Sequence, residues 1–290
     1  MTRTGFTLAV FALAGLAAPA LAAPLPAAAP DARASARRAL ERYGPAVVTV
    51  RVVLKRRLIS QGRERGSAES QLEVAGTTLT AAGLTVVSDV TTNPSALAGS
   101  GDTETRLDTE TTDVKIVLRD GRELPARFVL RDADLDLAFL VPDEAGLSLP
   151  FLDLAADPAP LPEPLDDLVY LYPLARSLGR ETGVVLDRVR GVSRKPRTFV
   201  ASDIVLGMQS LGCPVFDGAG RPVGLSVMRR APRTSTAGGG FRDVFDAFTP
   251  VVVTSADVRT VAKQALEHAA KTPPPARSPE PSPAPSPETR

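Results

Sequence analysis

The sequence predicts an all-β protein made of two six-stranded β-barrels, followed by a helix near its carboxyl end. Short runs rich in β-branched residues recur along the chain, and tight-turn signals separate them. These runs form two groups, divided by residues 142–167, which are rich in Pro, Asp and Ala. Periodicity alone leaves a β-sandwich open as an alternative.

The first group of strands follows a short helical stretch at residues 34–43. The pair Asp120-Gly121 is a strong hairpin signal, and Ala82-Gly83 separates two apolar runs in the same way. Residues 93–112, rich in Thr, Asp, Glu and Gly, are expected to form an acidic loop. The predicted strands lie within residues 47–54, 74–87, 113–118, 127–130 and 135–141.

The second group of strands ends in a predicted helix over residues 254–270, with Ser255 as its cap. Residues 217–220 (Asp-Gly-Ala-Gly) form a hairpin turn in this group, and residues 229–242 are expected to be a loop. The predicted strands are residues 168–171, 183–192, 198–200, 213–216 and 222–228.

The two ends of the chain differ from the rest in composition. Residues 1–22 have the charge, apolar run and small-residue exit of a signal peptide, with an uncleaved anchor as the alternative. We therefore expect export, to the periplasm or the extracellular space, with no integral membrane span once the signal is removed. Residues 23–33 are a predicted linker, and the Pro- and Ser-rich residues 272–290 a disordered tail. The lobes are expected at about 34–150 and 165–271.

Composition excludes several classes of function. The net charge of +1 gives no electrostatic reason to bind nucleic acid. Only one cysteine, Cys213, is present, so no internal disulfide can form. With one His and one Cys, the sequence predicts neither a metal site nor a cofactor. The carboxylates of residues 101–113 are more typical of a solvated loop than of a calcium site.

Four segments, in this order, resemble trypsin-like serine proteases of the bacterial Deg (HtrA) type. The resemblance covers about residues 37–270, and its third segment is the most specific. It implies a cleft between the barrels where a catalytic His, Asp and Ser meet. The segments are YGPAVVTVRV (43–52), AGTTLTAAGLTVVSDV (75–90), VLRDGRELPARFVLRDADLDLAFLVPD (117–143) and LGCPVFDGAGRPVGLSV (211–227).

The resemblance places Asp136 at the position of the triad aspartate. The histidine position falls on Asp89 or Val90, depending on a shift of one residue, and neither can act as an imidazole base. The only histidine, His268, lies near the end of the predicted helix, where a solvated side chain is expected.

The nucleophile motif is also changed, because Leu211 takes the position of the serine. Ser210 lies one residue early, so its side chain is expected to point elsewhere. Cys213 replaces a glycine and is expected to be a small buried residue. A Ser-Lys arrangement using Lys115 or Lys195 remains open, although nothing in the sequence marks either lysine as buried.

These substitutions predict an inactive protease homologue that binds a protein or an extended peptide in the interlobe cleft, as a regulatory module. The first alternative is an active serine endopeptidase that uses Ser210 and a non-standard arrangement. A further alternative is an envelope scaffold without a ligand.

Overall fold

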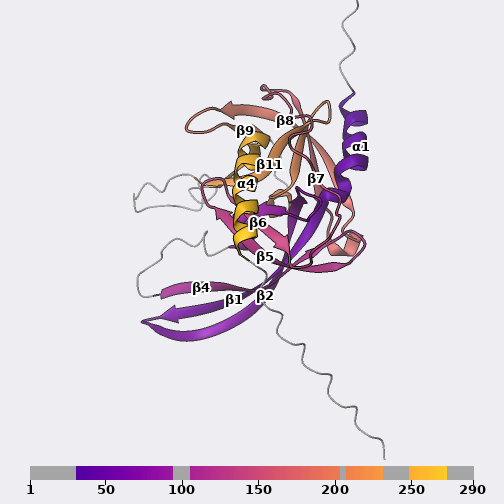
Figure 1. Ribbon diagram of the computed structural model, residues 1–290. Coiled ribbons are helices and arrows are strands. Elements are labelled where there is room, and N and C mark those ends of the chain that lie inside the picture. The colour runs from indigo at the N-terminus through magenta and orange to yellow at the C-terminus, as the bar shows by residue number, and fades with distance from the viewer. Residues whose placement is uncertain (1–30, 94–104, 203–206, 231–247, 273–290) are drawn as a thin grey trace, which may run out of the picture.

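Two closed antiparallel barrels, each of six strands, make up most of the computed structural model (Figure 1). The structure describes residues 31–93, 105–202, 207–230 and 248–272. The predicted signal segment 1–22, the first eight residues of the predicted linker and nearly all of the predicted tail lie outside them. The barrel architecture and the carboxyl-terminal helix are as predicted, and a β-sandwich is excluded.

The first barrel has the strand order β1-β2-β3-β6-β5-β4. Its β1 and β2 are longer than predicted and extend away from the barrel together with β4 (Figure 1). The predicted loop 93–112 is wrong from Thr105 onward, because its alternating Thr and charged residues pair with the extended β1. The strands are β1 (Val47–Ser60), β2 (Arg63–Thr78), β3 (Thr85–Ser88), β4 (Thr105–Val117), β5 (Glu123–Asp132) and β6 (Leu137–Pro142).

The second barrel has the order β10-β11-β12-β9-β8-β7 and includes one strand that the sequence did not predict. This strand is β12, which pairs with β11 and β9. Its only predictive signal is the run Val251-Val252-Val253 beside Pro250. The strands are β7 (Asp167–Pro173), β8 (Thr182–Ser193), β9 (Phe199–Ser202), β10 (Pro214–Asp217), β11 (Pro222–Arg230) and β12 (Phe248–Thr254).

Two helices flank the barrels. Helix α1 (Ala32–Tyr43) begins two residues earlier than predicted, inside the expected linker 23–33, because the Asp31 side chain caps it by accepting a hydrogen bond from the Arg33 N–H. Helix α4 (Ser255–Lys271) is capped by Thr254 and not, as predicted, by Ser255. Among the described residues, no helix is both long and apolar enough to cross a membrane.

The largest apolar core joins the two barrels to each other and to both helices. Tyr43 of α1 stacks on Phe216 of β10, with ring centroids 5.1 Å apart. On the surface, Arg180 of the second barrel makes a bidentate ion pair with Glu73 of β2, at 2.7 and 3.1 Å. Other members of this core include Val86, Leu137 and Phe139 of the first barrel, Val169, Leu171 and Leu225 of the second, and Val258 and Val261 of α4.

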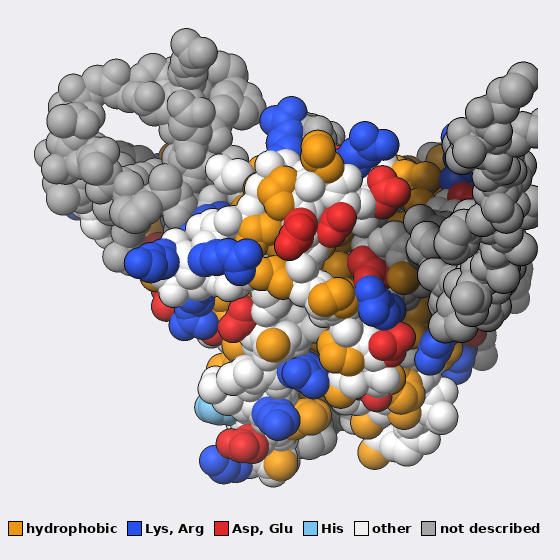
Figure 2. Space-filling view, turned by 90° about the horizontal axis from the view of Figure 1, so that it is seen from above, with side chains coloured by type: hydrophobic (Ala, Val, Ile, Leu, Met, Phe, Trp, Pro, Cys, Tyr) orange, Lys and Arg blue, Asp and Glu red, His pale blue; other side chains and the backbone are white. Residues whose placement is uncertain are grey.

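Charged side chains of both signs are interspersed over the described part of the face shown in Figure 2. This distribution agrees with the net charge of +1. The surface in this view therefore offers no extended electrostatic field of one sign for a polyanionic partner.

Candidate functional site: the interlobe surface around Asp136

Asp136 lies at the turn between β5 and β6, where its backbone adopts a left-handed conformation with φ of 55°. Its side chain is buried and accepts three hydrogen bonds. The Ser88 hydroxyl donates to Oδ2, the Val90 backbone N–H donates to Oδ1 at 2.8 Å, and the Met228 backbone N–H donates to Oδ2 at 2.8 Å. Since Met228 belongs to β11, the carboxyl group links the first barrel to the second.

Burial raises the pKa of the Asp136 carboxyl from 3.8 to about 6. The hydrogen bonds from Ser88, Met228 and Val90 lower this pKa, and the negative charge of Asp89 raises it further. Burial therefore outweighs the hydrogen bonds, and the carboxyl titrates in a mildly acidic range.

This raised pKa predicts that Asp136 makes the fold less stable as the pH rises from about 4 to about 6. The folded state holds the proton more tightly than the unfolded chain, so the stabilisation is complete at low pH and is lost as the pH passes the folded pKa. A pKa difference of about 2 corresponds to about 3 kcal/mol. Denaturant unfolding should show Asp136→Asn gaining about this much relative to wild type between pH 3 and pH 7. A constant offset between the two proteins would contradict the prediction.

Both candidate histidine positions lie beside Asp136 in the short helix α2 (Asp89–Thr92). Asp89 is buried, and its backbone N–H donates to the Asp136 backbone carbonyl at 3.0 Å. Its carboxylate forms an ion pair with Arg131, whose guanidinium also donates to the Thr92 hydroxyl at 3.0 Å. Val90 is buried and reaches Asp136 through its backbone. Two side chains that cannot carry out imidazole chemistry therefore occupy this region.

The nucleophile segment packs against the first barrel. Leu211 has no exposed surface. The carbonyl of the next residue, Gly212, accepts a hydrogen bond from the Thr77 hydroxyl of β2 at 2.8 Å. A Cβ atom on Gly212 would lie 3.1 Å from the Ser88 backbone nitrogen. The structure thus brings residues 211–212 next to the end of β3 that bonds Asp136, and the side chain of Leu211 is buried there.

Ser210 and Cys213 are both buried. Ser210 is only 2% exposed, at the end of a short 3-10 helix. Burial raises the pKa of the Cys213 thiol, which disfavours the reactive thiolate. Cys213 lies fully inside the protein, where it acts as a small apolar residue.

The remaining candidate bases lie elsewhere. His268 is exposed on α4, where its Nδ1 bonds the Gln264 carbonyl one turn earlier, at 2.8 Å. Lys115 is on the surface of β4, 3.4 Å from Glu123, and Lys195 is exposed after β8. Across the described ranges, no group of three or more His, Cys, Asp or Glu side chains is placed to hold a metal ion.

Sequence reasoning missed three partners of the site. Ser88 precedes the assumed histidine position, and its hydroxyl could have been considered as a donor to Asp136. The ion pair between Arg131 and Asp89 has no local signal, because the two residues are 42 positions apart. The Met228 contribution is a backbone N–H and leaves no mark in the side-chain sequence.

Comparison with known proteins agrees with the two-barrel fold. The model of the trypsin-like peptidase domain matches residues 76–225. Among solved structures, the fold is similar to an HtrA-type protease, AlgW, bound to a decapeptide, with a TM-score of 0.50 and 18% identity. That match covers 80% of this chain and 68% of that one. A search of curated proteins gave no match. The family match spans more than half of the chain, from β2 to β11, and the chain therefore belongs to the trypsin-like peptidase domain family.

Proposed function

We propose that the protein is an exported, catalytically inactive relative of trypsin-like serine proteases that binds a protein or an extended peptide. The observation that carries this proposal is the set of partners of Asp136. Its oxygens accept from Ser88, Val90 and Met228, whereas a working triad aspartate accepts from and orients an imidazole. Loss of both the base and the nucleophile lowers kcat by about a million-fold where such residues act as a unit.

Activity is tested directly with a serine-directed fluorophosphonate probe on the purified protein, with trypsin as a parallel positive control. We expect no labelling of this protein and no cleavage of casein. Labelling that maps to Ser210 and disappears in Ser210→Ala would instead support the alternative, an active serine endopeptidase. The 2% exposure of Ser210 disfavours that alternative, because a nucleophile must reach its substrate.

Peptide binding is supported by the carboxyl end of β11. Ser226 bonds Gly212 and Cys213, and the Met228 N–H bonds Asp136, but the strand continues past them to Arg230 alongside β12. An edge of this kind can accept an added strand through backbone hydrogen bonds, which do not require a triad. The AlgW structure, similar in fold, holds a decapeptide. The proposed binding surface lies between the two lobes, which span about residues 34–150 and 165–271.

Hydrogen exchange measures this binding where it is expected to occur. A saturating extended peptide should slow amide exchange at the end of β11, in residues 229–230, and leave β8 unchanged. If amide exchange rates were the same with and without each of a panel of extended peptides, the binding role would be contradicted and a scaffold would be favoured. The result on inactivity would not be affected. Export is supported by the composition of residues 1–22, and amino-terminal sequencing of the exported protein tests it.

A further inference from the structure

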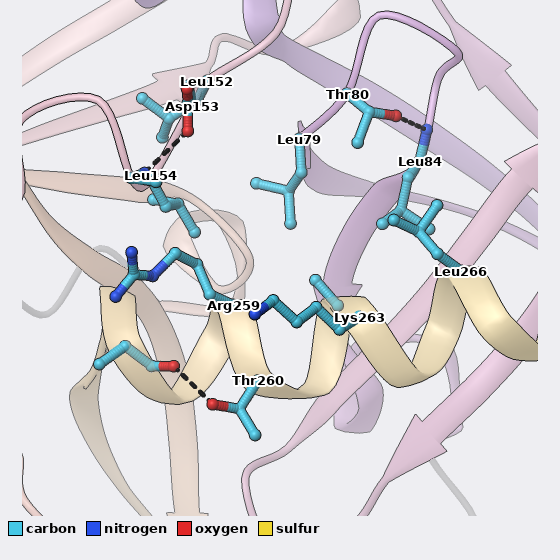
Figure 3. A pocket seen from close by; sticks show the side chains of 13 residues that line it. Leu79, Thr80, Leu84, Leu152, Asp153, Leu154, Arg259, Thr260, Lys263 and Leu266 are labelled. Carbon is cyan, nitrogen blue, oxygen red and sulfur yellow. Dashed lines mark hydrogen bonds between the residues drawn. The ribbon is translucent and has the colours of Figure 1, made fainter.

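A cavity of about 370 Å³ lies between α4, the connection from β2 to β3, and the segment after β6 (Figure 3). Leucine side chains form its apolar wall. Those of Leu79, Leu84, Leu152 and Leu154 belong to the buried core, and that of Leu266 is 43% exposed at the rim. Its volume lies in the range of small-molecule sites, roughly 300–1,000 Å³. None of its lining residues is a triad position.

Two cationic side chains of α4, Arg259 and Lys263, also line this cavity. They lie one turn apart and point together along the helix toward its amino-terminal end (Figure 3). Throughout the described part of the chain, neither has an acidic side chain within ion-pair distance. The Nε atom of Arg259 is buried without a hydrogen-bond partner. Like charges four residues apart on a helix repel each other, so an anion that contacts both is favoured.

The cavity also limits the charge of its ligand. Asp153 lies at the rim, with its carboxylate accepting a hydrogen bond from the Ala155 N–H at 2.8 Å. Its negative charge repels an anion, and more strongly a dianion than a monoanion. A ligand with one negative charge and a short apolar chain therefore fits the wall and the rim best.

We propose that this cavity binds an aliphatic carboxylate. The hydrocarbon chain lies on the leucine wall, and the carboxylate accepts hydrogen bonds from Arg259 and Lys263. The planar guanidinium suits a carboxylate because its N–H groups can donate in pairs. This site is independent of the proposed function, since it involves neither Asp136 nor β11.

Octanoate tests the proposal by isothermal titration calorimetry on the full chain, beside acetate and octan-1-ol. We expect octanoate to bind more tightly than either, because acetate lacks the chain and octan-1-ol lacks the charge. The double variant Arg259→Gln, Lys263→Gln should weaken octanoate binding by at least about tenfold and leave octan-1-ol binding unchanged. Lys271→Gln, on the same helix but outside the cavity, is the matched control and should bind as wild type.

A second variant tests the location. Ala262→Phe places a ring in the cavity and should abolish binding of both octanoate and octan-1-ol. If circular dichroism shows that this variant is unfolded, Leu266→Glu at the exposed rim takes its place and should weaken octanoate binding more than octan-1-ol binding, because it removes apolar wall and adds a like charge. Octanoate that binds no better than acetate, or binding that survives the double variant, would overturn the proposal.

Discussion

Leu211→Ser is expected to lower the free energy of unfolding by about 3–5 kcal/mol, although it restores the residue type of the nucleophile motif. Leu211 has no exposed surface, so the substitution removes buried apolar volume and places a hydroxyl in the space left behind. Denaturant unfolding measures the loss. Fluorophosphonate labelling should remain absent, because no imidazole is available at Asp89 or Val90.

The matched control is Leu178→Ser, since Leu178 is 60% exposed. It should change the free energy of unfolding by less than about 1 kcal/mol. If Leu211→Ser cost no more than Leu178→Ser, the nucleophile position would not be part of the core. Gain of fluorophosphonate labelling in Leu211→Ser would show that a base is present after all.

Gly212→Ala is expected to destabilise the protein by about 3–5 kcal/mol through a different cause. Gly212 has φ of 87°, and an added Cβ would lie 2.6 Å from the Ala75 backbone oxygen and 3.2 Å from the Val87 Cα. These atoms belong to strands of the first barrel and cannot move aside as a flexible side chain would. The methyl group would therefore push the nucleophile segment away from the first barrel, and thermal or denaturant unfolding would register the loss.

Gly121→Ala distinguishes the cost of the left-handed backbone conformation from the cost of the steric clash. Gly121 has φ of 85°, nearly the same as Gly212, but no atom lies within 4 Å of its added Cβ. This control should cost only about 1–2 kcal/mol, from the left-handed conformation alone. Equal losses in the two variants would mean that the close approach of the two barrels at Gly212 contributes nothing.

Together these results would support the proposed pseudoprotease. Asp136 is buried and links the two barrels, Leu211 is buried, and Asp89 is ion-paired with Arg131. Under the proposal, these side chains stabilise the contact between the barrels and do not take part in catalysis. The pH dependence of Asp136→Asn examines the same site through its charge.

Much of the architecture could be predicted because its signals are local. Alternating β-branched runs, the Asp120-Gly121 turn and the apolar spacing in α4 depend on neighbours a few residues apart. The prediction failed where distant pairing decided the structure. Residues 105–112 have a loop-like composition but form a strand because the extended β1 provides hydrogen-bond partners. The strand β12 contains only a short apolar run, Val251 to Val253, and it forms a strand because it pairs with β11 and β9.

Composition alone limits the chemistry of the site, because a chain with the single histidine His268 can supply only one imidazole. The family resemblance indicated which positions to compare. What surrounds Asp136 depends on folding: its contact with Met228 joins residues 92 positions apart through a backbone N–H, and the Arg131–Asp89 pair forms across β5 and α2. The cavity under α4 likewise exists only once the helix packs over leucines of the first barrel. The sequence determines which side chains are present and which short-range patterns they form. Their burial, their pKa values and their interaction partners depend on how the two barrels pack.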